Sequence, residues 1–337
     1  MVDDYDGEVL RERFASFEHA RRILDLEIAQ SQPGKINIER IMTRLEGRMP
    51  YDTPLGADKE VALLLSELKK VFRQRLENAR KEASFSEELK KFGEYCVEGG
   101  NSCITFNYDD FLDEALWDGT DGIPEKHWHP DGGYGFFCKP STDCVRNFDG
   151  YKDITSMSLL KLHGSVNWRP RLGWNTPYGV DSIVHHSQWF LARDPNTTIH
   201  GSVNLEEIER HLEPDPFIIP PVLAKSAIVR EPLLQAVWTQ AYNLIAQADE
   251  IVFLGYSFPI TDIAARVLFG ESVRSDVKVK VVNLASGEDK VRITGSYKQV
   301  FPTIEDSDFY WTNARDWINT LISQGLPVQP ADKVEAS

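Results

Sequence analysis

The chain has 337 residues, of which 42% are hydrophobic and 26% are charged, and its formal net charge at pH 7 is −15. This composition is typical of a globular protein and argues against a disordered chain. The negative charge would repel a nucleic acid unless basic residues were clustered, and the sequence has no block of lysines and arginines. We therefore expect no nucleic-acid partner.

The first hundred residues show the spacing of amphipathic helices. Apolar residues recur at steps of three and four over 10–24, and the same spacing returns over 36–45 and 61–72. A further helix is expected to end at Gly99, since glycine commonly follows the last helical turn. The pattern predicts a helical part over residues 1–101.

From residue 102 onward, short apolar runs alternate with helical segments. The predicted strands cover 103–106, 158–162, 217–219, 251–254 and 278–284. The predicted helices cover 110–117, 233–248, 263–269 and 309–322. Alternation of this kind is typical of the α/β class, in which a parallel sheet has helices on both faces.

Two stretches have no clear period, namely 119–150 and 169–213. The first is rich in glycine, proline and aspartate, and it also carries the aromatic residues Trp128, Tyr134, Phe136 and Phe137. We expect it to be irregular and to lie over or beside a ligand cleft, although a surface loop packed on itself would have the same composition. No internal repeat is visible.

Cysteine spacing and hydropathy bear on metal sites and on location. The four cysteines Cys96, Cys103, Cys138 and Cys144 form no closely spaced pair, so no zinc site is expected. No apolar run approaches the ~20 residues of a membrane span. The acidic N-terminus does not resemble a signal peptide, so we expect a cytoplasmic protein with no membrane partner.

Polar residues directly follow several of the predicted strands. The carboxyl ends of parallel strands meet at one edge of a sheet, where ligands bind in such folds. The residues expected at this edge are Asn107, Asp109, His163, Ser165, Gly255, Ser257 and Asn283.

Each of these residues has both a chemical and a structural interpretation. The amide of Asn107 could hold a water or a ribose hydroxyl, or it could form a turn or a helix cap. The imidazole of His163 could act as a general base, or it could be a structural residue at a strand end. Gly255 and Ser257 could contact a phosphate or form a plain tight turn, and Asn283 could bind ribose or serve as a cap.

Three segments in one order resemble a known family. The segments read ITFNYDDFLDEAL from Ile104, LLKLHGSVNW from Leu159 and ADEIVFLGYSFPITD from Ala248. Together they resemble the sirtuin-like family, in its bacterial, NAD-consuming branch of the phage-defence type. The similarity spans 102–284 and implies a Rossmann-like domain with a smaller inserted lobe. The expected organisation is one domain over 1–325, made of a helical part (1–101), a core (102–118 and 158–325) and an insertion (119–157), followed by a disordered tail (326–337).

The resemblance also implies an activity, which is hydrolysis of NAD at the nicotinamide–ribose bond in a bacterial antiviral setting. Asn107 would position water or ribose, and His163 would assist as a base. We infer in addition that Asp109 favours the positive charge that develops on the ribose. The residues expected to contact NAD, as substrate or ligand, are Thr105, Ser165, Gly255, Ser257 and Asn283, with no metal involved.

One part of the family pattern is missing from this sequence. The family has a strand followed by G-A-G-x-S, a loop that cradles the pyrophosphate, and nothing before Asn107 matches it. The sequence is therefore interpreted as truncated or as a degenerate member, and the chain as given is expected to hydrolyse NAD poorly. The competing interpretations are an NAD glycohydrolase, a non-catalytic NAD- or ADP-ribose-binding module, and a protein deacylase, which the absence of zinc-binding cysteines disfavours. A homo-oligomer or a defence-system partner protein is possible for any of these.

Overall fold

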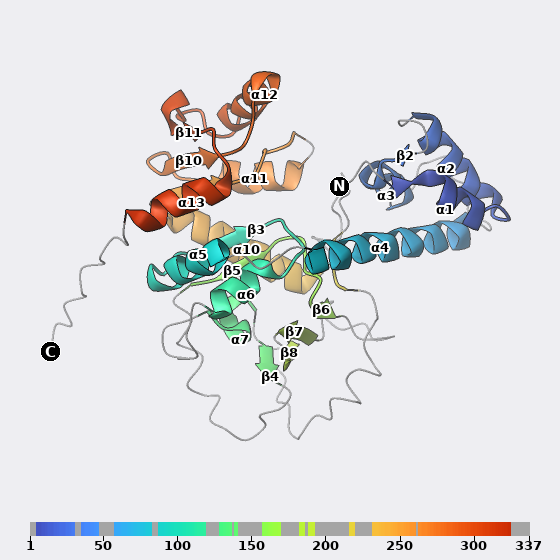
Figure 1. Ribbon diagram of the computed structural model, residues 1–337, viewed down its shortest axis with the longest axis horizontal. Coiled ribbons are helices and arrows are strands. Elements are labelled where there is room, and N and C mark those ends of the chain that lie inside the picture. Colours follow the sequence, from blue (N-terminus) through green and yellow to red (C-terminus); the bar gives the residue numbers. More distant parts are fainter. Residues whose placement is uncertain are drawn as a thin grey trace.

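The computed structural model combines α-helices with small sheets, as Figure 1 shows. It describes residues 5–30, 35–46, 57–82, 87–118, 128–136, 138–140, 157–169, 182–185, 188–192, 216–219, 231–260 and 262–324. The predicted α/β class is confirmed in this coarse form. The tail predicted to be disordered lies outside the described residues.

The N-terminal helices gather into a unit of their own, drawn in blue in Figure 1. Its elements are β1 (Tyr5–Asp6), α1 (Gly7–Arg13), α2 (Glu18–Gln30), β2 (Lys35–Ile36), α3 (Ile38–Glu46) and the first half of α4 (Ala57–Glu82). Their apolar stripes bury one cluster, here called the N-terminal core, formed by Leu10, Phe14, Ala20, Ile23, Leu24, Ile36, Ile41, Met42, Leu45, Leu64 and Leu68. The single helix predicted over 10–24 is interrupted by a turn at 14–16, which starts a second helix.

Helix α4 leaves the N-terminal core and reaches the centre of the molecule (Figure 1). Phe72 lies in the carboxyl-terminal half of α4, and its ring contacts the ring of Tyr108 edge to face, with centroids 5.2 Å apart. Tyr108 follows the first strand of the central part, so α4 links the N-terminal core to the region that carries the sequence motifs.

The central strands form two parallel sheets. Strand β3 (Cys103–Thr105) pairs in parallel with β5 (Leu159–Lys161). Strand β10 (Lys278–Val282) lies between β9 (Glu250–Leu254) and β11 (Phe309–Tyr310) and is parallel to both. The strand orders are β3-β5 and β11-β10-β9, and no hydrogen-bonded ladder joins the two sheets within the described residues.

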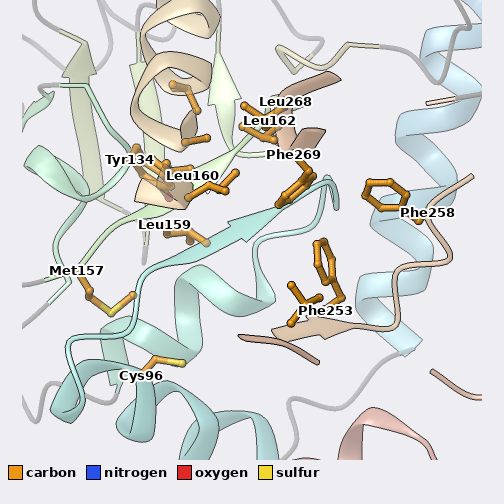
Figure 2. Packing of buried hydrophobic residues seen from close by; sticks show 14 of the residues in the cluster. Cys96, Tyr134, Met157, Leu159, Leu160, Leu162, Phe253, Phe258, Leu268 and Phe269 are labelled. Carbon is orange, nitrogen blue, oxygen red and sulfur yellow. The ribbon is translucent and has the colours of Figure 1, made fainter. Parts of the chain in front are cut away.

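Helices cover both sheets and bury one common cluster, here called the main core. These helices are α5 (Glu87–Glu98), α6 (Phe111–Asp118), α10 (Pro232–Gln247), α11 (Ile263–Ser272), α12 (Gly287–Lys298) and α13 (Ala314–Ser323). Figure 2 shows how side chains from both sheets and from the helices meet, with Leu160 and Leu162 from one sheet region and Phe253 from the other. Because one cluster contains residues from both sheets, the sheets belong to a single packed unit.

The segment predicted to be irregular contains ordered structure where it is described. It includes α7 (Pro130–Gly133) and β4 (Cys138–Pro140), and Trp128 and Tyr134 are buried in the main core. β4 joins a four-stranded antiparallel sheet of order β4-β8-β7-β6, whose other members are β6 (Trp168–Arg169), β7 (Ser182–His185) and β8 (Gln188–Ala192). The prediction of an irregular stretch over 169–213 is therefore wrong at β7 and β8, which form a hairpin.

Two further predictions about elements need correction, and one helix was not predicted. Residues 217–219 do not form a ladder strand, since only an isolated antiparallel bridge joins Ile218 to Gly164. The helix predicted over 309–322 begins later, because Phe309 starts β11 after a short 3-10 helix, η3 (Asp306–Asp308). Helix α12 was not predicted, since its exposed glycine and scattered polar residues conceal its period.

Candidate functional site

The loops that follow β3, β5 and β9 contact one another at one edge. The ring of Phe106, just after β3, lies 5.2 Å from the ring of His163, just after β5. On its other side, Phe106 stacks on Tyr256, just after β9, with centroids 4.6 Å apart. The ring of Tyr108 lies 6.0 Å from that of His163. We call Phe106, Tyr108, His163 and Tyr256 the aromatic edge cluster.

Asn107 lies between two members of this cluster and is exposed. Its backbone N–H donates to Oγ1 of Thr105 at 3.0 Å, which fixes the turn at the end of β3. The half-buried Thr105 thereby has a structural role in the turn. The amide side chain of Asn107 is left facing solvent, where a ligand can reach it.

Asp109 is held in place at both its main chain and its side chain. Its carboxylate Oδ1 accepts from the backbone N–H of Phe111 at 3.2 Å, at the start of α6. Its carbonyl oxygen accepts from Nζ of Lys161 at 2.5 Å. The carboxylate therefore caps a helix, the structural alternative to an electrostatic role at a ligand.

Lys161 belongs to a buried polar network beneath this edge that the sequence analysis missed. Its ammonium forms an ion pair with Asp113 at 2.8 Å, and both side chains are 0% exposed. Asp113 also accepts from the hydroxyl of Tyr134 and, at 3.4 Å, from Nδ2 of Asn167. A lysine placed between leucines in the run Leu159–Leu162 is the sequence signal that could have revealed it.

His163 is only 5% exposed, and its ring packs against Phe106 and Tyr108. Its carbonyl oxygen accepts from the backbone N–H of Ile219 at 2.8 Å. Gly164, next to it, has φ of +78°, and a Cβ there would overlap the carbonyl oxygen of Phe217. The close approach that this glycine permits is thus made by the protein's own chain.

Ser165 is 0% exposed and already has partners. Its hydroxyl donates to the carbonyl oxygen of Tyr108 at 3.3 Å, and its backbone N–H donates to Phe217 at 3.0 Å. The first bond joins the loop after β5 to the loop after β3, and the second joins it to the segment 216–219. A ligand could reach Ser165 only if these contacts moved.

Gly255 offers open backbone at the end of β9. It is exposed, has φ of +68°, and a Cβ there would meet no atom within 4 Å. The half-buried Ser257 follows two residues later. A phosphate could approach this glycine closely, as a side chain would not permit.

Asn283 and Tyr297 both hold the carbonyl oxygen of Tyr256 in this turn. Nδ2 of Asn283 donates to the carbonyl oxygen of Tyr256 at 3.1 Å, and the hydroxyl of Tyr297 donates to the same oxygen at 2.9 Å. The hydroxyl of Tyr256 donates to Oδ2 of Asp262 at 3.0 Å. Burial, together with the charge of Asp262, raises the pKa of Tyr256 well above its usual value, so this phenol stays neutral.

The structure therefore brings together the loops that carry Asn107, His163 and Gly255, and it links Asn283 to them through Tyr256. It leaves Asn107 and Gly255 accessible, whereas His163 and Ser165 are buried. Sequence reasoning did not predict that the aromatic edge cluster would join the loops after β3, β5 and β9. Its signal is the aromatic residues beside Asn107 and Gly255, namely Phe106, Tyr108 and Tyr256.

No family model matches the chain, and no curated protein matches it at a significant level. Within the described residues, no three His, Cys, Asp or Glu side chains are grouped so that they could hold a metal ion. Among the helices that the structure describes, none has both the length and the apolar character needed to cross a membrane.

Proposed function

We propose that the chain is a sirtuin-like protein that binds NAD at the carboxyl edge of β3, β5 and β9 and hydrolyses its nicotinamide–ribose bond. One observation carries the proposal. The segments containing Asn107, His163 and Gly255 are far apart in sequence, yet Phe106, His163 and Tyr256 are in ring contact at one edge. Ligands of parallel α/β folds bind at such an edge, and the two parallel sheets would then form a Rossmann-like core.

The accessible groups suit different parts of a dinucleotide. The open backbone at Gly255 would let a phosphate approach closely, and the Ser257 hydroxyl would donate to it. The exposed amide of Asn107 would orient the nicotinamide ribose and the attacking water, because an amide both donates and accepts. Thr105, Ser165 and Asn283 would then shape the turns that carry these contacts.

The reaction needs little covalent assistance from the protein. Water adds to C1′ of the ribose as the C1′–N bond breaks, which yields ADP-ribose, neutral nicotinamide and a proton. Asp109 would favour the positive charge on the ribose, and His163 would accept the proton. This outcome fits the bacterial antiviral setting that the sequence resemblance implies.

A second candidate is a module that binds NAD or ADP-ribose without cleaving it. The burial of His163 among aromatic rings and the helix-capping bond of the Asp109 carboxylate favour this candidate. Both groups would have to move before they could act on a ligand. The two candidates share a binding site and differ only in turnover.

The test measures NAD binding by calorimetry and nicotinamide release on the same protein preparation. We expect binding to the unaltered chain and a loss of affinity of about tenfold or more in Gly255→Ala, since the methyl group occupies the space for phosphate. Gly287→Ala is the matched control, because Gly287 also has a positive φ, of +52°, and a Cβ there also meets no atom within 4 Å.

Release that Asn107→Ala abolishes would support the hydrolase, and binding without release would support the module. Absence of binding, or equal binding by Gly255→Ala and the unaltered chain, would contradict both.

A further inference from the structure

Two cysteine side chains are in contact where helix α5 leads into strand β3. Cys96 lies in the last turn of α5, is only 2% exposed and belongs to the main core, as Figure 2 shows. Cys103 is the first residue of β3 and is half-buried. Both are free thiols, and their Sγ atoms are 3.8 Å apart. At this distance the two sulfur atoms are in van der Waals contact.

The backbone between the two cysteines fixes this contact. The N–H of Asn101 donates to the carbonyl oxygen of Cys96 at 2.8 Å, and Gly100 has φ of +62°, as in a common motif that ends helices. Beyond this turn, the N–H of Cys103 donates to the carbonyl oxygen of Ser158 at 2.7 Å. Because main-chain bonds hold both cysteines, their proximity is a property of the fold.

The two thiols differ in their access to solvent. Cys103 is the more exposed of the two, and exposure favours the reaction of a thiol with an oxidant. The hydrogen bond with Cys103, together with burial, raises the pKa of the Cys96 thiol well above its usual value, so Cys96 stays protonated. An oxidant from solvent would therefore react first with Cys103, and Cys96 lies where it can attack the product.

We propose that Cys103 is an oxidation site and that Cys96 is its resolving thiol, so that hydrogen peroxide converts the pair into a reversible disulfide. This modification goes beyond the proposed function, because neither thiol is assigned to NAD binding or hydrolysis. The same chemistry would apply to other hydroperoxides small enough to reach Cys103.

The oxidation takes place in two balanced steps. The sulfur of Cys103 attacks one oxygen of the peroxide, the O–O bond breaks, and the departing hydroxide takes the thiol proton and leaves as water. The sulfur of Cys96 then attacks the resulting sulfenic acid at the sulfur of Cys103. The S–O bond breaks as the S–S bond forms, and the hydroxide leaves with the proton of Cys96 as a second water. A dithiol reductant restores both thiols by exchange.

The disulfide would fasten β3 to α5. Helix α5 is in backbone contact with α6, since a Cβ on Gly93 would overlap the carbonyl oxygen of Ala115. We therefore expect α5 to stay in place and the start of β3 to be drawn towards it. The loop that carries Asn107 directly follows β3, so the redox state of the pair would also affect the candidate edge.

Peptide mapping of the full chain tests the pair. Reduced protein is treated with hydrogen peroxide, the remaining thiols are blocked with iodoacetamide in urea so that buried thiols also react, and the chain is digested with trypsin. Cys96 and Cys103 fall in one peptide, 92–126, and Cys138 and Cys144 fall in another, 127–146.

We expect peptide 92–126 to be two hydrogen atoms lighter and to carry no label, and to accept two labels after treatment with dithiothreitol. A peptide 92–126 that keeps both labels after peroxide treatment, or that is linked to peptide 127–146, would overturn the proposal.

Two matched variants test the separate roles of the thiols. Cys96→Ala removes the resolving thiol, so dimedone, which traps sulfenic acids, should label Cys103 about tenfold more than in the unaltered chain. Cys103→Ala leaves the buried Cys96 and should show little label. Similar labelling of the remaining cysteine in both variants would contradict the assigned order of attack. If Cys96→Ala does not fold, the peptide map of the unaltered chain decides.

Amide hydrogen exchange measures the structural consequence. The N–H of Cys103 bonds to Ser158, and the N–H of Leu162 bonds to Thr105 across the β3–β5 ladder. We expect exchange at Cys103 and Leu162 to slow by about threefold or more in the oxidised chain, because the tether limits the separation of β3 from its neighbours. Cys96→Ala should show no such response to peroxide. Equal exchange in the reduced and oxidised chains would show that the disulfide does not fasten β3.

Discussion

Lys161 places a positive charge in a fully buried position, where it needs a partner of opposite charge. Asp113 supplies that partner, and Tyr134 and Asn167 satisfy its remaining oxygen. The same ammonium holds the carbonyl oxygen of Asp109. The network thus connects β5, α6 and the segment that contains Tyr134 to the loop that carries Asn107.

Removing one partner of this pair should destabilise the protein strongly. We expect Lys161→Met to lower the free energy of unfolding by about 3–5 kcal/mol, because it leaves the charge of Asp113 buried without compensation. The double variant Lys161→Met with Asp113→Leu should recover much of the loss, since it buries no charge. Urea unfolding curves measure both values, and equal losses in the single and double variants would show that the ion pair is not the cause.

His129 gives the stability a dependence on pH. Its ring lies 5.2 Å from that of Trp117, and burial lowers the pKa of its imidazole from 6.5 to about 4. The unfolded chain therefore binds this proton at a higher pH than the native chain does. The contribution of neutral His129 to the free energy of unfolding is fully present above pH 6.5. It is lost as the pH falls towards 4, by up to about 3 kcal/mol.

The measurement compares the unaltered chain with His129→Gln between pH 7 and pH 4. Carboxylates titrate in the same range, so only the difference between the two proteins reports on His129. This difference should shrink or reverse as the pH falls. Two stability curves that stay parallel over the whole range would contradict the assignment.

At the scale of elements, the sequence predicts best where a short apolar run is bounded by turns. That is why β3, β5, β9 and β10 are close to their predicted ranges. The hairpin of β7 and β8 was missed because glycines, prolines and polar residues surround it, and β11 because two residues carry no period.

In the candidate site too, features set by local sequence are predicted, and features set by distant contacts are not. The sequence predicts that polar residues follow the strands, since that is a matter of order along the chain. It does not predict that Phe217 approaches Gly164, nor that His163 and Ser165 are buried. Those features arise from a contact with residues distant in sequence, which hydrophobic periodicity does not encode.

Glycines in two helices provide a prediction about packing between elements. In α5, a Cβ on Gly93 would overlap the carbonyl oxygen of Ala115 in α6, so the two helices are in backbone contact there. Gly93→Ala should therefore cost about 1–3 kcal/mol, because the helices must separate. Gly295→Ala in α12 meets no atom and should stabilise the protein by about 1 kcal/mol. Thermal unfolding of both variants checks this, and effects of the same sign would show that the α5–α6 contact does not decide the outcome.

At the scale of the whole molecule, the described residues bury two separate apolar clusters. The N-terminal core contains Leu24 and Leu64, and the main core contains Leu160 and Phe253. Helix α4 extends from the first towards the second, and the contact of Phe72 with Tyr108 is one link between them. Two clusters joined by few contacts need not unfold together, since cooperativity depends on shared buried surface.

We therefore expect two transitions in calorimetric unfolding, one for each core. Leu24 and Leu160 are both 0% exposed, so replacing either by alanine should cost about 2–5 kcal/mol through the lost burial and the cavity that remains. Leu24→Ala should lower the transition of the N-terminal core and leave the other in place, and Leu160→Ala should do the reverse. Exchange rates of α2 and β5 amides in the two variants assign each transition to its core. A single transition that both variants lower equally would mean that α4 couples the two cores into one cooperative unit.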